Sequence, residues 1–186
     1  MNRTATVMMK NDNPILVHYC TVADVTTQEF KKFTDNYRSA ILEFMSKDKN
    51  GPKLTLEVVK TVDGKDVLHQ RMDPGIFMVS ARSVIVQQYH IDLGNDEYIF
   101  FTSSKDSAEY EKEFAKAIGK DVLATLEINY WHFKPTEDKK GSIVTHVNSS
   151  KPNGSIPNMI VNKMTAKQAD AIIGISKWVS GKLWSN

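Results

Sequence analysis

The sequence predicts an α+β fold in which a curved antiparallel sheet carries its helices on one face. Six or seven segments alternate like strands and follow one another through short turns, as in a meander. The two main segments with helical spacing lie one early and one, which is long, at the C-terminal end, so most helices and strands are segregated along the chain. With 186 residues, 41% of them hydrophobic, the chain can bury one sizeable core, and we expect one domain over residues 1–186.

The first half of the chain predicts a strand, a helix and a hairpin. Residues 14–22 alternate with apolar side chains on both sides, which is typical of a strand with two covered faces. The helix, roughly residues 26–46, starts at the capping sequence Thr26-Thr27-Gln28-Glu29. Strands over 54–59 and 66–72 meet at Asp63-Gly64, the strongest hairpin signal in the chain.

The second half predicts further strands around one short helix. A long strand over 76–90 turns at Gly94-Asn95 into a strand over 98–102. Residues 104–119 have the pattern of a short helix that stops at Gly119. A long strand over 122–133, a polar turn and a last strand over 142–148 follow.

The C-terminal end predicts a long helix that covers the sheet. The last strand breaks at Lys151–Pro157, and some 28 residues of helical pattern follow at once. At 1.5 Å per residue this helix would span about 40 Å, which is the width of a small domain. Residues between such a helix and the sheet are candidates for a ligand cavity.

Composition and motifs exclude several classes of function. The net charge of +2 comes from interspersed acidic and basic residues, so we expect no nucleic-acid partner. The sequence has no run of about 18 apolar residues, and its polar start does not resemble a signal peptide. The single cysteine, Cys20, fits a reducing compartment, and we expect a cytoplasmic protein. No catalytic or metal-binding motif is present and the five histidines are widely spaced, so we expect no enzyme, no cofactor and no metal.

The final third of the chain resembles the START family, the steroidogenic acute regulatory protein-related lipid-transfer domains. Residues 144–148, the turn Asn153-Gly154-Ser155-Ile156-Pro157 and residues 159–163 are similar to the family's last strand, Gly-x-x-Pro turn and lid helix. Residues 80–86 resemble a further strand opening, and the resemblance covers about residues 14–180. It implies a helix-grip fold, in which a curved antiparallel sheet of about six to seven strands wraps around the long C-terminal helix and an internal hydrophobic cavity.

Several departures from the family leave the ligand open. The family's N-terminal helix has no counterpart here, so the resemblance is to a reduced, divergent member. Lys151 and Ser155 stand where the family has an acidic or amide residue and an aromatic one. The charged positions of the sterol-binding members would fall on Met72 and Gln88. A phospholipid, a sterol or a fatty-acyl lipid all remain candidates.

Carrying a lipid requires an apolar wall and a few polar groups for the head. An exposed sixteen-carbon tail costs on the order of 12 kcal/mol, which a closed apolar cavity removes. The predicted lining consists of apolar candidates and possible head-group partners, in chain order Met72, Met78, Arg82, Val84, Gln88, Phe100, Leu126, Ile128, Tyr130, His132, Met159, Ile160, Met164 and Ile172. Packing of the sheet against helices alone would also bury such residues, and Arg82 could instead pair with an acid such as Glu127 or project into solvent.

Three functions follow as hypotheses. The first is a non-enzymatic, monomeric lipid carrier or sensor that contacts membranes transiently, with Trp178, Trp184, Lys177 and Lys182 as candidate contact residues. The second is a helix-grip enzyme, of cyclase or hydrolase type, that acts on a hydrophobic substrate through His132 or Tyr130 in the cavity. The third is a ligand-free protein-interaction module, which a cavity well under about 300 Å³ would support.

Overall fold

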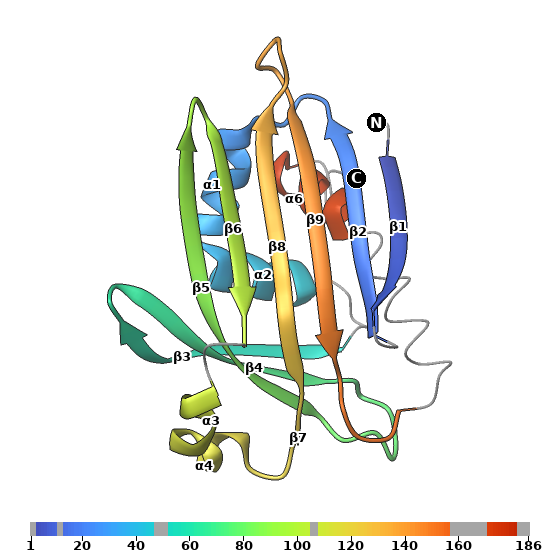
Figure 1. Cartoon of the computed structure of the whole chain (residues 1–186), viewed down its shortest axis with the longest axis vertical. Coiled ribbons are helices and arrows are strands. Elements are labelled where there is room, and N and C mark those ends of the chain that lie inside the picture. The colour runs from blue at the N-terminus through green and yellow to red at the C-terminus, as the bar shows by residue number, and fades with distance from the viewer. Residues whose placement is uncertain (1–2, 11–12, 47–51, 105–107, 157–170, 182–186) are drawn as a thin grey trace.

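One antiparallel sheet dominates the computed structural model, which describes residues 3–10, 13–46, 52–104, 108–156 and 171–181 (Figure 1). Eight strands are neighbours in the order β1-β2-β9-β8-β6-β5-β4-β3, and the short β7 pairs in parallel with β5. The strands are β1 Arg3–Lys10, β2 Asn13–Val22, β3 Lys53–Val62, β4 Lys65–Asp73, β5 Arg82–Gly94, β6 Glu97–Ser103, β7 Val122–Leu123, β8 Thr125–Pro135 and β9 Ser142–Lys151.

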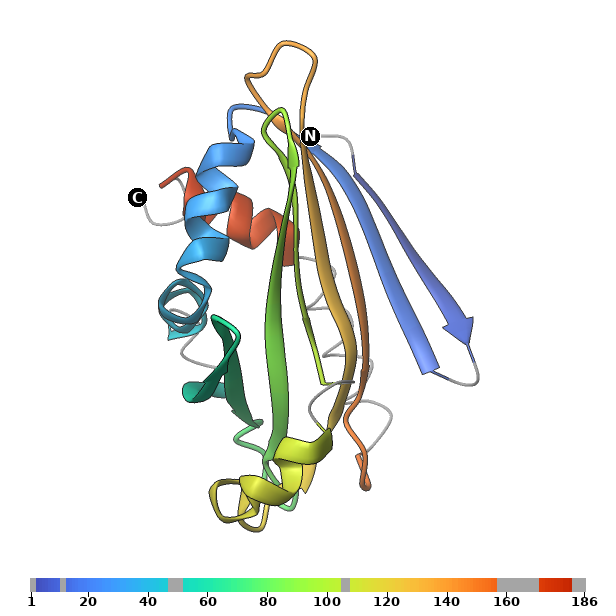
Figure 2. The same ribbon diagram turned by 60° about the vertical axis from the view of Figure 1, so that its left-hand side comes forward.

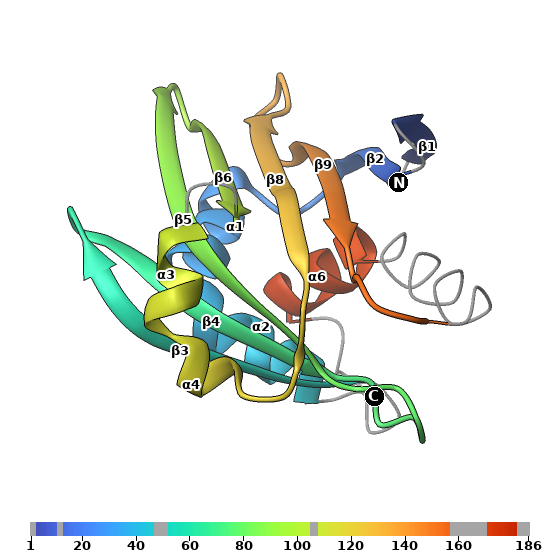
Figure 3. The same cartoon turned by 60° about the horizontal axis from the view of Figure 1, so that its bottom comes forward.

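The helices form two groups on opposite faces of this sheet. Helices α1 (Thr27–Asp35), α2 (Tyr37–Ser46) and α6 (Ala171–Val179) cover one face, which we call the inner face (Figure 2). The short helices α3 (Ala108–Glu113) and α4 (Ala115–Ile118) lie at one end, beside β4, β5 and β7 (Figure 3). None of the helices described is long and apolar enough to cross a membrane. The predicted α+β class is confirmed, but the expectation that all helices lie on one face is wrong, because α3 and α4 pack on Val67 and Ile85 of the opposite face.

The predicted helix over 26–46 is in fact two helices. It begins as expected, because Thr26 and Glu29 form a reciprocal capping box. It breaks at Asn36, whose side-chain amide donates to the carbonyl of Lys32 at 2.9 Å. An asparagine that bonds its own preceding turn competes with helix continuation, so α2 restarts at Tyr37 in a new direction.

The predicted strand over 76–90 starts later than expected, at Arg82. The Asp73 carboxylate accepts the backbone N–H of Gly75 at 2.9 Å, and Gly75 and Met78 both have positive φ. These turns interrupt the alternation that the sequence continues through residues 76–80. The segment 74–81 is therefore a loop between β4 and β5.

The segment between β6 and β8 also has more interruptions than the sequence pattern predicted. The helical region has a kink at Phe114, and Gly119 ends it with a φ of 62°, as predicted. The backbone N–H of Ala124 donates to the carbonyl of Ser83 at 2.8 Å, and this separates β7 from β8. The predicted strand over 122–133 is thus two strands that pair with different neighbours.

At the N-terminal end the chain forms a strand that was not predicted, and at the C-terminal end only part of the predicted helix is described. Strand β1, which the sequence analysis did not predict, pairs along its length with β2. Of the predicted C-terminal helix the structure describes α6, and residues 157–170 lie outside the described ranges. Helix α6 contributes Ile175 to the largest buried cluster, which joins α1 to β2, β6, β8 and β9.

Candidate ligand-binding face

Strand register divides the side chains of the sheet into two faces. Directly paired residues point to the same side, so pairing across β5, β6, β8, β9 and β2 defines rows. One row consists of His90, Phe100, Trp131, His146 and His18. The Phe100 ring lies 4.9 Å from the ring of Tyr37 on α2, so this row belongs to the inner face.

The next row along the inner face is largely polar. It consists of Gln88, Thr102, Asn129, Asn148 and Leu16. We call its four polar members the polar band. Polar side chains at the centre of a covered face cost free energy unless they are paired, so the band is a candidate for ligand recognition.

Asn129 is the centre of a buried hydrogen-bond network. Its Oδ1 accepts from Nε1 of Trp131 at 3.1 Å and lies 2.9 Å from Nε2 of His146. The side chain of Asn129 also lies close enough to Tyr37 of α2 to influence the pKa of its phenol. The His146 ring stacks on Trp131 with centroids 3.9 Å apart, and His18 follows at 5.6 Å. Side chains of three strands, β2, β8 and β9, therefore meet in this network.

Burial keeps the titratable groups of the network uncharged. It raises the pKa of Tyr37 to about 12, against a smaller opposite effect of the nearby Asn129 side chain. Burial, with the neighbouring His18, lowers the pKa of His146 to about 3. At neutral pH the network therefore offers dipoles and no net charge.

An apolar wall adjoins the polar band on the side of β3 and β4. It is a cluster of five buried residues, Leu56, Leu68, Val84, Val86 and Leu126. Ile41 and Leu42 of α2 and Leu54 of β3 pack against it. A polar band beside an apolar wall suits a molecule that has one polar end and an apolar body.

The structure places six of the predicted lining residues on the inner face. Val84, Phe100 and Leu126 are buried there, and Gln88 is part of the polar band. Met72 and Arg82 pair with each other at the far end of the face. Their contact with a ligand stays a prediction.

Three predicted lining residues of β8 lie on the outer face instead. A bulge at Glu127 shifts the register, so Leu126 points inward while Ile128, Tyr130 and His132 point outward. The His132 ring contacts the Glu97 carboxylate at 2.7 Å on that side. These three residues therefore point away from the inner face and do not line the proposed site.

Met78 is also wrongly predicted as a lining residue. It lies in the loop 74–81, where 88% of its surface is exposed. Its positive φ of 67° belongs to the turn that replaces the expected strand. Met78 therefore lies on the protein surface and not in the wall of a cavity.

Arg82 binds backbone carbonyls, which neither of the predicted arrangements anticipated. Its guanidinium donates to the carbonyls of Ser80, Pro152 and Asn153. Glu127, the acid suggested as its partner, instead binds Lys151 at 2.7 Å. Arg82 thus holds the turn between β9 and the C-terminal helical region.

The predicted lid residues cannot be placed against this face. Met159, Ile160 and Met164 lie outside the described residues. Ile172 belongs to α6, and the structure does not describe its side chain. Their role as lining residues remains a prediction.

The sequence analysis missed Asn129, Tyr37 and His146. A signal was present in β8, because the large aromatic residues Trp131 and Phe133 alternate with Tyr130 and His132. The bulkiest apolar side chains mark the covered face of a strand. Asn129 shares their parity, and this parity would have identified it.

A serine, a histidine and an aspartate meet on the outer face, but their hydrogen bonds do not suit nucleophilic catalysis. The hydroxyl of Ser83 donates to Asp121 at 2.7 Å, so the 3.0 Å contact with His69 must carry a proton from the imidazole. A histidine that donates to a serine cannot act as its base. Among the described side chains, no group of His, Cys, Asp and Glu could hold a metal ion.

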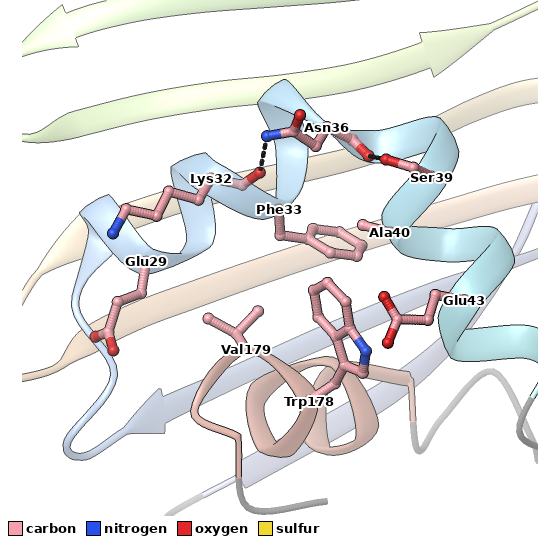
Figure 4. A pocket seen from close by; sticks show the side chains of 9 residues that line it. All are labelled: Glu29, Lys32, Phe33, Asn36, Ser39, Ala40, Glu43, Trp178 and Val179. Carbon is pink, nitrogen blue, oxygen red and sulfur yellow. Dashed lines mark hydrogen bonds between the residues drawn. The ribbon is translucent and has the colours of Figure 1, made fainter.

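A surface groove of about 390 Å³ lies between α1, α2 and α6 (Figure 4). Phe33 and Trp178 face each other across it, with ring centroids 5.7 Å apart. Lys32, Asn36 and Glu43 along its sides are exposed. This groove is open and partly polar, unlike the covered inner face.

Comparison with known proteins identifies the fold. No protein-family model and no curated protein matches the sequence. Human StAR-related lipid transfer protein 5 superposes with a TM-score of 0.67 at 8% identity, over 96% of this chain and 86% of that one. A STAR-related lipid transfer protein from Xanthomonas axonopodis gives 0.65 at 15%, over 97% and 93%. Human STARD10 gives 0.63 at 16%, over 96% and 73%. The chain therefore has the helix-grip fold of START domains, as the sequence predicted.

Proposed function

We propose that this protein binds one lipid between the inner face and the helices that cover it, and that it transfers or senses that lipid without catalysis. The observation that carries the proposal is the polar band beside the apolar wall, on the face that three helices cover. The similar solved structures support it, because their names describe lipid transfer proteins.

Burial of a lipid tail along the apolar wall supplies the driving force. Each methylene removed from water contributes roughly 0.8 kcal/mol, so a long chain gains on the order of 10 kcal/mol before ordering costs. The wall consists of aliphatic side chains from β3, β4, β5 and β8, with α2 above it. Apolar contacts with such a wall are not directional, so the wall can bind tails of variable shape.

The loop 74–81 is the part of the surface that best supports transient membrane contact. Phe77 and Met78 are 92% and 88% exposed, and Ile76 is 44% exposed. Three adjacent exposed apolar residues are unusual on a soluble surface and suit insertion at a bilayer interface. Trp178, the residue predicted for this role, packs against Phe33 instead, and Trp184 and Lys182 lie outside the described residues.

The enzyme hypothesis loses the residues on which it was based. His132 and Tyr130 lie on the outer face, away from the proposed lipid. We therefore propose a non-enzymatic carrier that acts as a monomer in the cytoplasm, where the buried Cys20 would stay reduced.

A matched pair of variants on β3 tests the proposed site. Leu54 points to the apolar wall and Thr55, the next residue, points outward. We expect Leu54→Trp to fill the wall and reduce lipid loading about tenfold or more, while Thr55→Trp binds as the unmodified protein does. Loading is measured by native mass spectrometry after incubation with lipid vesicles, and urea unfolding verifies that both variants fold. Equal loading of the two variants contradicts the proposed site.

A further inference from the structure

The tautomer of His146 follows from its neighbours. The indole Nε1 of Trp131 can only donate, so the Asn129 atom 3.1 Å away must be the amide oxygen. The same oxygen lies 2.9 Å from Nε2 of His146. Two acceptors do not bond each other, so Nε2 carries the ring proton and Nδ1 is an acceptor.

This acceptor atom is buried. His146 is 3% exposed, and its Nδ1 has no hydrogen-bond partner in the part of the chain that the structure describes. A buried acceptor without a partner is costly, and in native proteins such an atom marks a site for a ligand or an ordered water molecule. The stacking of Trp131 on the ring holds the imidazole in place.

The sheet side chains around His146 are uncharged. The two central rows of the inner face contain no Lys, Arg, Asp or Glu. Arg82 lies on the same face but six residues along β5 from Gln88, about 20 Å away, and its donors already bind carbonyls. An anionic head group buried beside His146 would lack a compensating cation.

Gln88 lies in a different part of the inner face. Its Nε2 is buried and likewise has no partner within the described residues. Strands β6 and β8 separate it from β9, so the two backbones are about 14 Å apart. One head-group atom cannot meet both side chains, and the inference therefore rests on His146.

We propose that the bound lipid has an uncharged head group with a hydrogen-bond donor, a hydroxyl or an amide N–H, which donates to Nδ1 of His146. This proposal rests on the proposed function and narrows its ligand class. A phosphodiester group and an ionised carboxylate carry no such donor, and their negative charge is disfavoured at this position.

Three probes with the same tail test the proposal. They are 1-hexadecanol, its methyl ether and hexadecanoate, in competition with a fluorescent lipid at pH 7.5. We expect the alcohol to bind about tenfold tighter than the ether, as one buried hydrogen bond allows, and tighter than the carboxylate. Equal binding of alcohol and ether, or tighter binding of the carboxylate, overturns the proposal.

A variant and a spectroscopic readout locate the contact. His146→Phe keeps an aromatic ring at this position and removes Nδ1, so the ratio of alcohol affinity to ether affinity should fall to about one. In the unmodified protein, the ¹⁵N signal of His146 Nδ1 should move upfield with the alcohol and stay in place with the ether; no movement with the alcohol contradicts the contact. If neither the fluorescent lipid nor any of the probes binds, the proposed function itself fails; if all three probes bind alike, only this inference fails.

Discussion

At the scale of single residues, Asn129 connects the two layers of the molecule. Its amide oxygen joins Trp131 and His146 on neighbouring strands, and the same side chain lies near Tyr37 of α2, whose pKa it influences. A side chain that satisfies two partners at once fixes their geometry, because buried polar networks are costly when incomplete. The position of the polar band therefore depends on one residue of β8.

The buried histidine predicts a pH dependence of stability. The folded-state pKa of His146 is about 3, below the value of ~6.5 for an exposed histidine. Between these values the unfolded chain binds a proton that the folded protein does not, so the free energy of unfolding falls as pH falls through this range. At pH 5 the loss from this residue amounts to ~2 kcal/mol relative to neutral pH.

Urea unfolding at pH 7.5 and pH 5 measures this effect. His146→Phe should show a smaller decrease in unfolding free energy than the unmodified protein. Part of the decrease should persist, because burial also lowers the pKa of His69 and His90. An identical decrease in the variant contradicts the assignment to His146.

For single residues, the sequence predicted the apolar or polar character of the lining better than the face of the sheet to which each side chain points. Val84 and Phe100 were correctly placed on the covered face because strand alternation continues through them. Ile128, Tyr130 and His132 were misplaced because one inserted residue at Glu127 inverts the parity of the strand. The bulge itself depends on pairing with β9, so the parity that Leu126 indicates does not continue beyond it, and only the aromatic residues Trp131 and Phe133 marked the covered parity there.

At the scale of elements, a polar network attaches the α3–α4 segment to the outer face. Asp121, at its end, accepts from Arg71 at 2.8 Å and from Ser83 at 2.7 Å. Tyr110, Phe114 and Ile118 pack on Val67 and Ile85 nearby. The α3–α4 segment thus covers part of the sheet opposite the proposed lipid.

Asp121→Ala should destabilise the protein without changing lipid binding. Loss of the carboxylate leaves the buried Ser83 without its acceptor, and we expect a decrease of ~1–3 kcal/mol in the unfolding free energy. Glu113→Ala is the control, because its ion pair with Lys60 is exposed and contributes ~0–1 kcal/mol. Similar urea midpoints for the two variants would refute the anchoring role.

The loop 74–81 should control exchange with membranes. In Phe77→Ser/Met78→Ser, loss of two inserted side chains should weaken vesicle binding and slow lipid transfer by about tenfold or more. Ile91→Ser removes an apolar residue that is 44% exposed elsewhere and should transfer lipid normally. Transfer between fluorescent donor and acceptor vesicles measures the rate, and unchanged transfer in the double variant argues against membrane contact through this loop.

At the scale of the whole molecule, the order of elements was the part most fully predicted. Alternation, the Asp63-Gly64 hairpin and the terminal helical pattern together indicated a sheet covered by helices, and the resemblance indicated the helix-grip fold. Strand β1 was missed because its alternation is weak and its stability comes from pairing with β2. The break at Ala124 was missed because a tertiary contact with Ser83 produces it. The break at Asn36 was missed because its local hydrogen bond to Lys32 interrupts an apolar pattern that continues on both sides.

The central claim is that one lipid occupies the space between the inner face and the covering helices. Native mass spectrometry of the intact protein, purified from cells and then offered a broad lipid extract, tests it most directly. We predict a single added mass per chain, released as a lipid with an uncharged hydroxyl or amide head group. A protein that carries no lipid after purification and accepts none from the extract contradicts the account.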